Sequence, residues 1–200
     1  MSSFLYSQLE PPWRTIPLGK GGNETIGTAG CLLTKMATIA SLNDFQITPG
    51  ELNRIACREG YFTGGNRLYF SLLELFGLNV EVIDCFQNPA PVDRIDGALK
   101  CGGYALAQVD FVPRTRSIQE HWVRIAYLES SNDYVVDDPW TGRETSLMAR
   151  YAHYAWPDPS RAIYRLALYF PSDQGKSFDP LADSYREQQY HITSKEAYLE

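Results

Sequence analysis

Apolar positions in the first part of the chain recur with a helical period. Between residues 31 and 43 they fall on one face of a predicted helix: Leu32, Leu33, Met36, Ile39 and Ala40. Thr48-Pro49 is typical of a helix start, and this second helix is expected to run to about Cys57. A third helix is predicted at 66–76, ended by Gly77.

The second part of the chain shows the alternation and short apolar runs of β-strands. Strands are predicted at 79–84, 104–110, 121–128, at 134–139 with its end at Pro139, and at 161–170, with a short helix at 91–100. The polar residues 129–133 join two of these strands into a hairpin. Residues 1–30 resemble an extended arm with loops. Because helices come first and an antiparallel sheet later, we expect an α+β fold with two lobes and a cleft between them.

Length and composition favour one domain, residues 1–170, followed by a tail at 171–200. The chain has 200 residues, of which 44% are hydrophobic and 13% aromatic, and this is enough for one well-buried core. The segment from Ser172 to Glu200 is polar and charged without a broad apolar stripe. We expect a surface tail there, either simply solvated or a docking segment for a partner or another copy.

The net charge of −6 and a pI near 5.1 argue against nucleic acid or an anionic membrane as the main partner. No apolar run approaches the ~18 residues of a membrane span, and the first residues lack the basic and apolar regions of a signal peptide. We therefore expect a protein that is cytoplasmic as synthesised, and released or virion-associated if it is of phage origin. The four cysteines are expected to be free thiols, and no metal site or cofactor is implied.

A cysteine stands at the start of the first predicted helix. In Thr25-Ile-Gly-Thr-Ala-Gly-Cys31 the glycine at 30 allows the chain to turn sharply into that helix. Free N–H groups and the positive end of the helix dipole favour an anion there, so the sulfur is expected to ionise more readily than that of a free cysteine. Cys31 is therefore a candidate nucleophile, although a small apolar residue packed under a loop would give the same pattern.

A cysteine nucleophile needs a histidine to carry protons and an acceptor to orient that histidine. The chain has three histidines, at 121, 153 and 191, and His121 opens the predicted strand 121–128. Asp137 and Asp138 lie on the next strand and point to opposite faces, so only one of them can orient His121. The other would face solvent or pair with an arginine such as Arg143 or Arg124.

The position of the hairpin turn decides which residue lies opposite His121. If the turn centres on Glu129-Ser130, Asp138 takes that place. If it centres on residues 131–132, Gly142 takes that place, and a bulge is needed to bring a carboxylate to the histidine.

Taken in order, these motifs resemble the papain-like cysteine peptidases, in particular the bacteriocin-leader-processing peptidases and their relatives (cysteine peptidase family thirty-nine). The likeness covers about residues 5–145. It rests on Gln8, Gly30-Cys31, Thr48-Pro-Gly-Glu-Leu-Asn53 with one inserted glycine, His121-Trp-Val123 and Asp138-Pro-Trp-Thr-Gly142. Many relatives carry Gly-Pro after the cysteine, whereas this chain has Leu32-Leu33, so a more apolar first turn is expected to reshape the primed side of the cleft.

The resemblance implies a papain-like two-lobed fold in which Cys31 is the nucleophile, His121 the base and acid, and Asp138 the orienting carboxylate. By the same likeness, Gln8 and the backbone N–H of Cys31 form the oxyanion hole. On the residues alone, Gln8 could instead be a polar residue of an exposed arm.

The reaction implied is thiol-dependent hydrolysis of an amide bond in a peptide or protein substrate. The best-known relatives cut after a double glycine in a leader peptide, but they are fused to a transporter. The alternatives are a cell-wall (peptidoglycan) peptide hydrolase or an acyl transferase on the same triad, and a catalytically silent virion or binding protein with this fold. The oligomeric state stays open.

Overall fold

The computed structural model describes residues 5–64, 66–113, 115, 117–130, 133–152 and 158–172. Of the tail expected at 171–200, only Pro171 and Ser172 belong to these residues, and His153 and His191 lie outside them. The elements are, in order, α1 (Ile26–Ala29), α2 (Cys31–Leu42), α3 (Pro49–Arg58), the 3-10 helix η1 (Phe70–Phe76), β1 (Leu78–Asp84), α4 (Val92–Lys100), β2 (Tyr104–Asp110), β3 (Glu120–Ser130), β4 (Asp133–Asp138), β5 (Arg143–Ser146), α5 (Leu147–Tyr151), α6 (Pro159–Ala162) and β6 (Arg165–Pro171).

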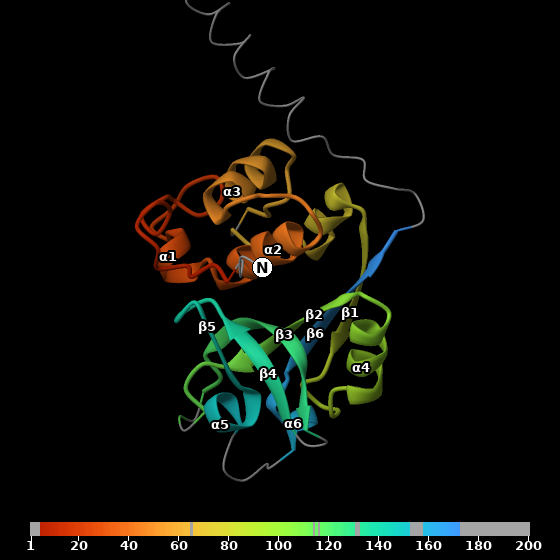
Figure 1. The fold of residues 1–200 in the computed structure, drawn as a ribbon. Helices are drawn as coiled ribbons and strands as arrows, with labels where there is room; N and C mark the ends of the chain where they lie inside the picture. The colour runs from red at the N-terminus through yellow and green to blue at the C-terminus, as the bar shows by residue number, and fades with distance from the viewer. Residues whose placement is uncertain are drawn as a thin grey trace, which may run out of the picture.

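One mixed assembly of helices and strands makes up the described part of the chain. Its six strands form a single antiparallel sheet in the order β1-β6-β2-β3-β4-β5. Figure 1 shows α1, α2 and α3 on one side of this sheet and α4, α5 and α6 on the other. The α+β class, with helices first and an antiparallel sheet later, is confirmed.

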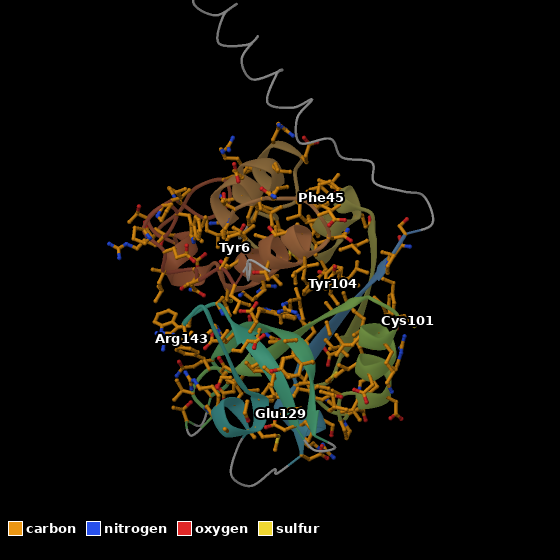
Figure 2. All side chains as sticks on the ribbon, in the orientation of Figure 1. Tyr6, Phe45, Cys101, Tyr104, Glu129 and Arg143 are labelled. Carbon is orange, nitrogen blue, oxygen red and sulfur yellow. The ribbon has the colours of Figure 1, made fainter. Side chains whose placement is uncertain are left out.

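Two buried clusters lie on opposite faces of the sheet. Along β2, Leu106 belongs to the cluster with α2 and α3, whereas Ala105 and Ala107 belong to the cluster with α4, α5 and α6. Side chains occupy the space on both sides of the sheet (Figure 2). Because both faces are covered, β2 and β4 are buried along almost their whole length.

The start of α3 and the end of η1 lie where local chemistry predicted. Thr48 caps α3: its Oγ1 accepts from the N–H of Glu51, whose carboxylate accepts from the N–H of Thr48 at 2.8 Å. Gly77 ends η1 with a left-handed φ of 76°. The third predicted helix starts later than expected, at Phe70, because Leu68 forms an isolated bridge with Phe62.

One predicted strand ends where expected, and another is shorter in the structure. The strand predicted to end at Pro139 ends at Asp138, and Gly142, with φ 66°, closes a turn by donating its N–H to Asp138 O at 2.8 Å. The chain then returns as β5, which the sequence pattern did not predict. The strand expected at 161–170 begins at Arg165, because the Asp158 side chain caps the short helix α6.

Candidate active site

Cys31 is the first residue of α2, and it lines a cleft beside the sheet. Gly30 precedes it with a φ of −87°, which other residues adopt easily, so the turn does not require glycine. Glycine is required instead by the close packing of α1, because a Cβ on residue 30 would lie 2.4 Å from Ile26 O. The N–H groups that open α2 have no acceptor within the helix and favour negative charge at this position.

His121 and Asp138 form a buried pair at this cleft. The His121 Nε2 atom lies 2.9 Å from Asp138 Oδ1, and the two residues are only 4% and 1% exposed. Because Nε2 is held by the carboxylate, Nδ1 is the ring nitrogen left for Cys31. Cys31 of α2 is close enough to interact with His121 of β3, which is bonded to Asp138 of β4, so the structure brings the three residues together.

The register of β3 and β4 explains how Asp138 reaches His121. Ser130 pairs with Asp133, and this register corresponds to the second of the two alternatives. Two register shifts follow along the hairpin, and Arg124 then pairs with Asp137. Asp138 is therefore a diagonal neighbour of His121 on the same face rather than its direct opposite.

The electrostatics of this pair favour an imidazolium beside a carboxylate. Burial lowers the pKa of His121, but hydrogen bonds to Asp138 and Cys31 outweigh it and hold the pKa above 6.5. Burial raises the pKa of Asp138, but hydrogen bonds from His121 and the Trp140 amide, together with the nearby Tyr151 hydroxyl, outweigh it and hold the pKa below 3.8. The Trp140 N–H donates to Asp138 Oδ1 at 2.8 Å.

Gln8 is buried in the wall of the same cleft, only 2% exposed, and is not part of an exposed arm. Its backbone N–H donates to Pro139 O at 2.7 Å, which fastens the N-terminal arm to the turn after Asp138. Its Nε2 donates one N–H to Gly27 O in α1 at 2.9 Å. Since an amide nitrogen carries two N–H groups, the second is not used by this bond.

Phe111 covers the imidazole, and the sequence pattern did not point to it. Its ring centroid lies 4.8 Å from that of His121 and 5.3 Å from that of Trp140. Phe111 follows directly after β2, so its position over β3 depends on how the sheet folds. The aromatic contact keeps water away from one side of the histidine.

A second buried charge cluster joins α2 to the sheet, one helical turn after Cys31. Lys35 Nζ lies 2.6 Å from Asp137 Oδ1 and 2.9 Å from Tyr6 O, and Arg124 Nε lies 3.4 Å from Asp137 Oδ2. Burial lowers the pKa of Lys35 to about 8, because the nearby Asp137 offsets it only in part. Asp137 thus pairs with Arg124, one of the expected alternatives, and with a lysine that the sequence did not single out.

The cleft has a volume of about 780 Å³ and is lined from both sides. Residues of α1, α2 and the segment 62–70 form one wall, and β2, β3 and the turn after β4 form the other. Within the wall, Gln108 is 1% exposed, and its Oε1 has no hydrogen-bond partner. The lining mixes aromatic side chains with charges of both signs: Tyr69, Phe70, Trp122, Trp140, Glu24, Glu120, Arg67 and Arg165.

Comparison with protein-family models and with curated proteins found no match for this chain. Among the described residues, no helix is both long enough and apolar enough to cross a membrane. In the same part of the chain, no group of three or more His, Cys, Asp and Glu side chains is placed to hold a metal ion. All four cysteines are unpaired.

Proposed function

We propose that this protein is a thiol-dependent hydrolase of amide bonds, with Cys31, His121 and Asp138 as its triad and with the two-lobed arrangement of papain-like peptidases. One observation carries the proposal: Cys31 opens α2 on one side of a cleft, and the buried His121–Asp138 pair lies beside it on the other. A thiol, an imidazole held by a carboxylate and a substrate-sized cleft are the parts that this chemistry needs.

In the proposed reaction, His121 Nδ1 accepts the proton of Cys31, and the sulfur attacks the carbonyl carbon of the substrate. His121 then returns this proton to the leaving nitrogen as the C–N bond breaks, leaving a thioester on Cys31. Water adds to the thioester with His121 as base, and its hydrolysis releases the acid and restores the thiol. Asp138 keeps the ring oriented and stabilises the imidazolium.

The oxyanion of each tetrahedral intermediate would be bound by the free N–H of Gln8 Nε2 and by the backbone N–H of Cys31. The bond from Gln8 to Gly27 O fixes the amide next to the start of α2. Pre-positioned donors of this kind are worth about 10²–10³ in rate. The mixed aromatic and charged lining of the cleft favours a peptide or protein substrate.

The test is cleavage of a peptide library and of purified peptidoglycan, followed by mass spectrometry. Cys31→Ala is expected to abolish turnover, whereas Cys101→Ala, which removes an exposed thiol, is expected to leave it intact. Gln8→Ala is expected to lower kcat by about 10²-fold or more. Equal turnover in the wild type and Cys31→Ala would rule out the thiol mechanism. Cleavage of the peptide library indicates a peptidase, and cleavage of the peptidoglycan indicates a cell-wall hydrolase.

A further inference from the structure

Two buried oxygens next to the His121–Asp138 pair have no hydrogen-bond partner. One is Asp138 Oδ2 and the other is the hydroxyl oxygen of Tyr151. Asp138 Oδ1 already accepts from His121 Nε2 and from the Trp140 N–H, so only Oδ2 remains free to accept. A buried carboxylate oxygen without a donor is costly, and so is a buried hydroxyl without an acceptor.

The helix that carries Tyr151 is fastened to the strand that carries Asp138. Ser146 caps α5 by accepting from the Ala149 N–H at 2.8 Å, and Asp133 of β4 accepts from the Met148 N–H at 3.0 Å. Tyr151, at the end of this short helix, is 1% exposed. The bond to Asp133 therefore ties the helix that carries Tyr151 to β4 itself.

The Tyr151 ring also lies against the histidine. The ring centroids of Tyr151 and His121 are 5.9 Å apart with an interplanar angle of 37°. The Arg150 guanidinium covers the outer side, 5.0 Å from the Tyr151 centroid and 5.2 Å from that of Phe111. The Tyr151 ring is thus enclosed between the imidazole of His121 and the Arg150 guanidinium, which also lies over Phe111.

Tyr151 and Asp138 act on each other electrostatically. Burial raises the pKa of Tyr151, and the charge of Asp138 raises it further, so the hydroxyl keeps its proton. The same hydroxyl contributes to the lowered pKa of Asp138. The Tyr151 hydroxyl and Asp138 Oδ2 fall outside strict hydrogen-bond geometry in this conformation. They are nevertheless the unpartnered donor and the unpartnered acceptor at this point.

We propose that Tyr151 is a positioning residue of this site, whose hydroxyl donates to Asp138 Oδ2 and so keeps Oδ1 on His121. A carboxylate held by His121, the Trp140 N–H and Tyr151 cannot rotate away from the ring. His121 then presents Nδ1 to Cys31 in a fixed direction. The consequence for catalysis rests on the proposed function, whereas the bond itself does not.

Tyr151→Phe keeps the ring and removes only the hydroxyl, so the variant tests the bond directly. We expect its melting temperature at pH 6 to fall by about 5 °C, the loss of one hydrogen bond to a charged group in a protein of this size. The deficit should shrink toward pH 3, because the contribution of Asp138 is lost as the pH falls through its lowered pKa. The NMR titration of His121 should move to higher pH, since a carboxylate with one donor fewer stabilises the imidazolium more strongly.

Tyr134→Phe is the matched control. Tyr134 is a buried tyrosine on β4 whose hydroxyl donates to a different carboxylate, Asp96 Oδ1, at 2.7 Å. This control is expected to lose stability as well, while its His121 titration stays at the wild-type value. Signals of the other two histidines are identified with His153→Gln and His191→Gln variants.

Where hydrolysis is measurable, Tyr151→Phe is expected to lower kcat about 10-fold at unchanged KM, and Tyr134→Phe is expected to leave both unchanged. If the wild type hydrolyses nothing, the proposed function fails, but the melting temperature and the titration still decide the role of Tyr151. A Tyr151→Phe protein that is as stable as the wild type or more stable, with an unshifted His121 titration, would overturn the proposal.

Discussion

Asp137 and Asp138 are neighbours in the sequence, yet the pleat of β4 gives them different partners. Asp138 lies 2.9 Å from His121 at the cleft, whereas Asp137 is bonded to Lys35 and Arg124 between α2 and the sheet. One carboxylate therefore belongs to the candidate chemistry and the other to the attachment of α2. Replacing each in turn separates the two roles.

Asp138→Asn is expected to remove hydrolysis in a protein that still folds, because an amide cannot stabilise the imidazolium; losses of about 10⁴ in kcat are typical. Asp137→Asn is expected to lower the melting temperature by about 10 °C, since breaking a buried pair costs about 3–5 kcal/mol. Turnover and thermal melts on the same two proteins check this. The opposite result, an inactive but stable Asp137→Asn protein, would transfer the orienting role to Asp137.

The pH dependence of the Asp138→Asn melt gives a second readout. Because the pKa of His121 is raised, its stabilisation is complete below 6.5 and is lost as the pH rises through its value in the folded protein. Because the pKa of Asp138 is lowered, its stabilisation is present above 3.8 and is lost as the pH falls through its folded value. The gap between the wild type and Asp138→Asn is therefore expected to be widest between about pH 4 and 6.5.

Single residues of the candidate site differ in how far the sequence alone could predict them. Cys31, His121, Asp138 and Gln8 stand in short motifs with a recognisable order. Phe111, Tyr151 and Lys35 stand in no motif, and their contacts with His121, Asp138 and Asp137 exist only once separate elements have packed together. Lys35 did carry one weak signal, a charge four residues after Cys31 in a helix of mostly small and apolar residues.

Among the elements, α2 matters most to the site, and its start depends on the junction with α1. Gly30→Ala would place a Cβ 2.4 Å from Ile26 O and 2.8 Å from Ile26 Cα, both of which are backbone atoms. The backbone must then shift and carry Cys31 with it. We expect a drop of about 5 °C in melting temperature, as for a strained core insertion of about 1–3 kcal/mol, and slower alkylation of Cys31.

Gly97→Ala is the control for that change. Gly97 lies within α4, and a Cβ there would meet nothing within 4 Å, so alanine is expected to be neutral or stabilising. Thermal melts of the two variants make the comparison. If Gly30→Ala behaves like Gly97→Ala, the close packing of α1 on α2 does not position Cys31.

Elements with a local signal were predictable, and those set by long-range packing were not. The start of α3 and the end of η1 follow from Thr48 and Gly77, whose capping contacts lie within a few residues. The β3–β4 register depends on two irregularities that no local motif indicated. The strand β5 and the helix α5, which complete the surroundings of Asp138, carry no apolar pattern of their own, so the sequence indicated only the end of the strand before them at Pro139.

At the scale of the whole molecule, the order of elements was enough to predict the α+β class but not the order of strands. β6 comes last in the chain and lies between β1 and β2, so β1 and β2 have no ladder with each other. The position of β6 between β1 and β2 depends on how the apolar side chains of the strands pack in the two buried clusters. The candidate site depends on that assembly, since its thiol lies on a helix on one side and its histidine and carboxylate lie on strands.

The central claim, that Cys31 and His121 form a reactive pair, is tested most directly by alkylation near pH 6. Iodoacetamide reacts with the thiolate, and an ordinary exposed thiol, with a pKa near 8.5, is less than about 1% ionised there. His121, with its raised pKa, carries a positive charge beside Cys31 at this pH. Burial raises the pKa of Cys57 and Cys85, and Cys101 is the exposed internal control.

Brief treatment followed by peptide mapping is expected to label Cys31 well ahead of the other three cysteines, and His121→Ala is expected to remove this lead. If Cys31 in the wild-type protein reacts no faster than Cys101, the proposed thiol–imidazole pair is contradicted.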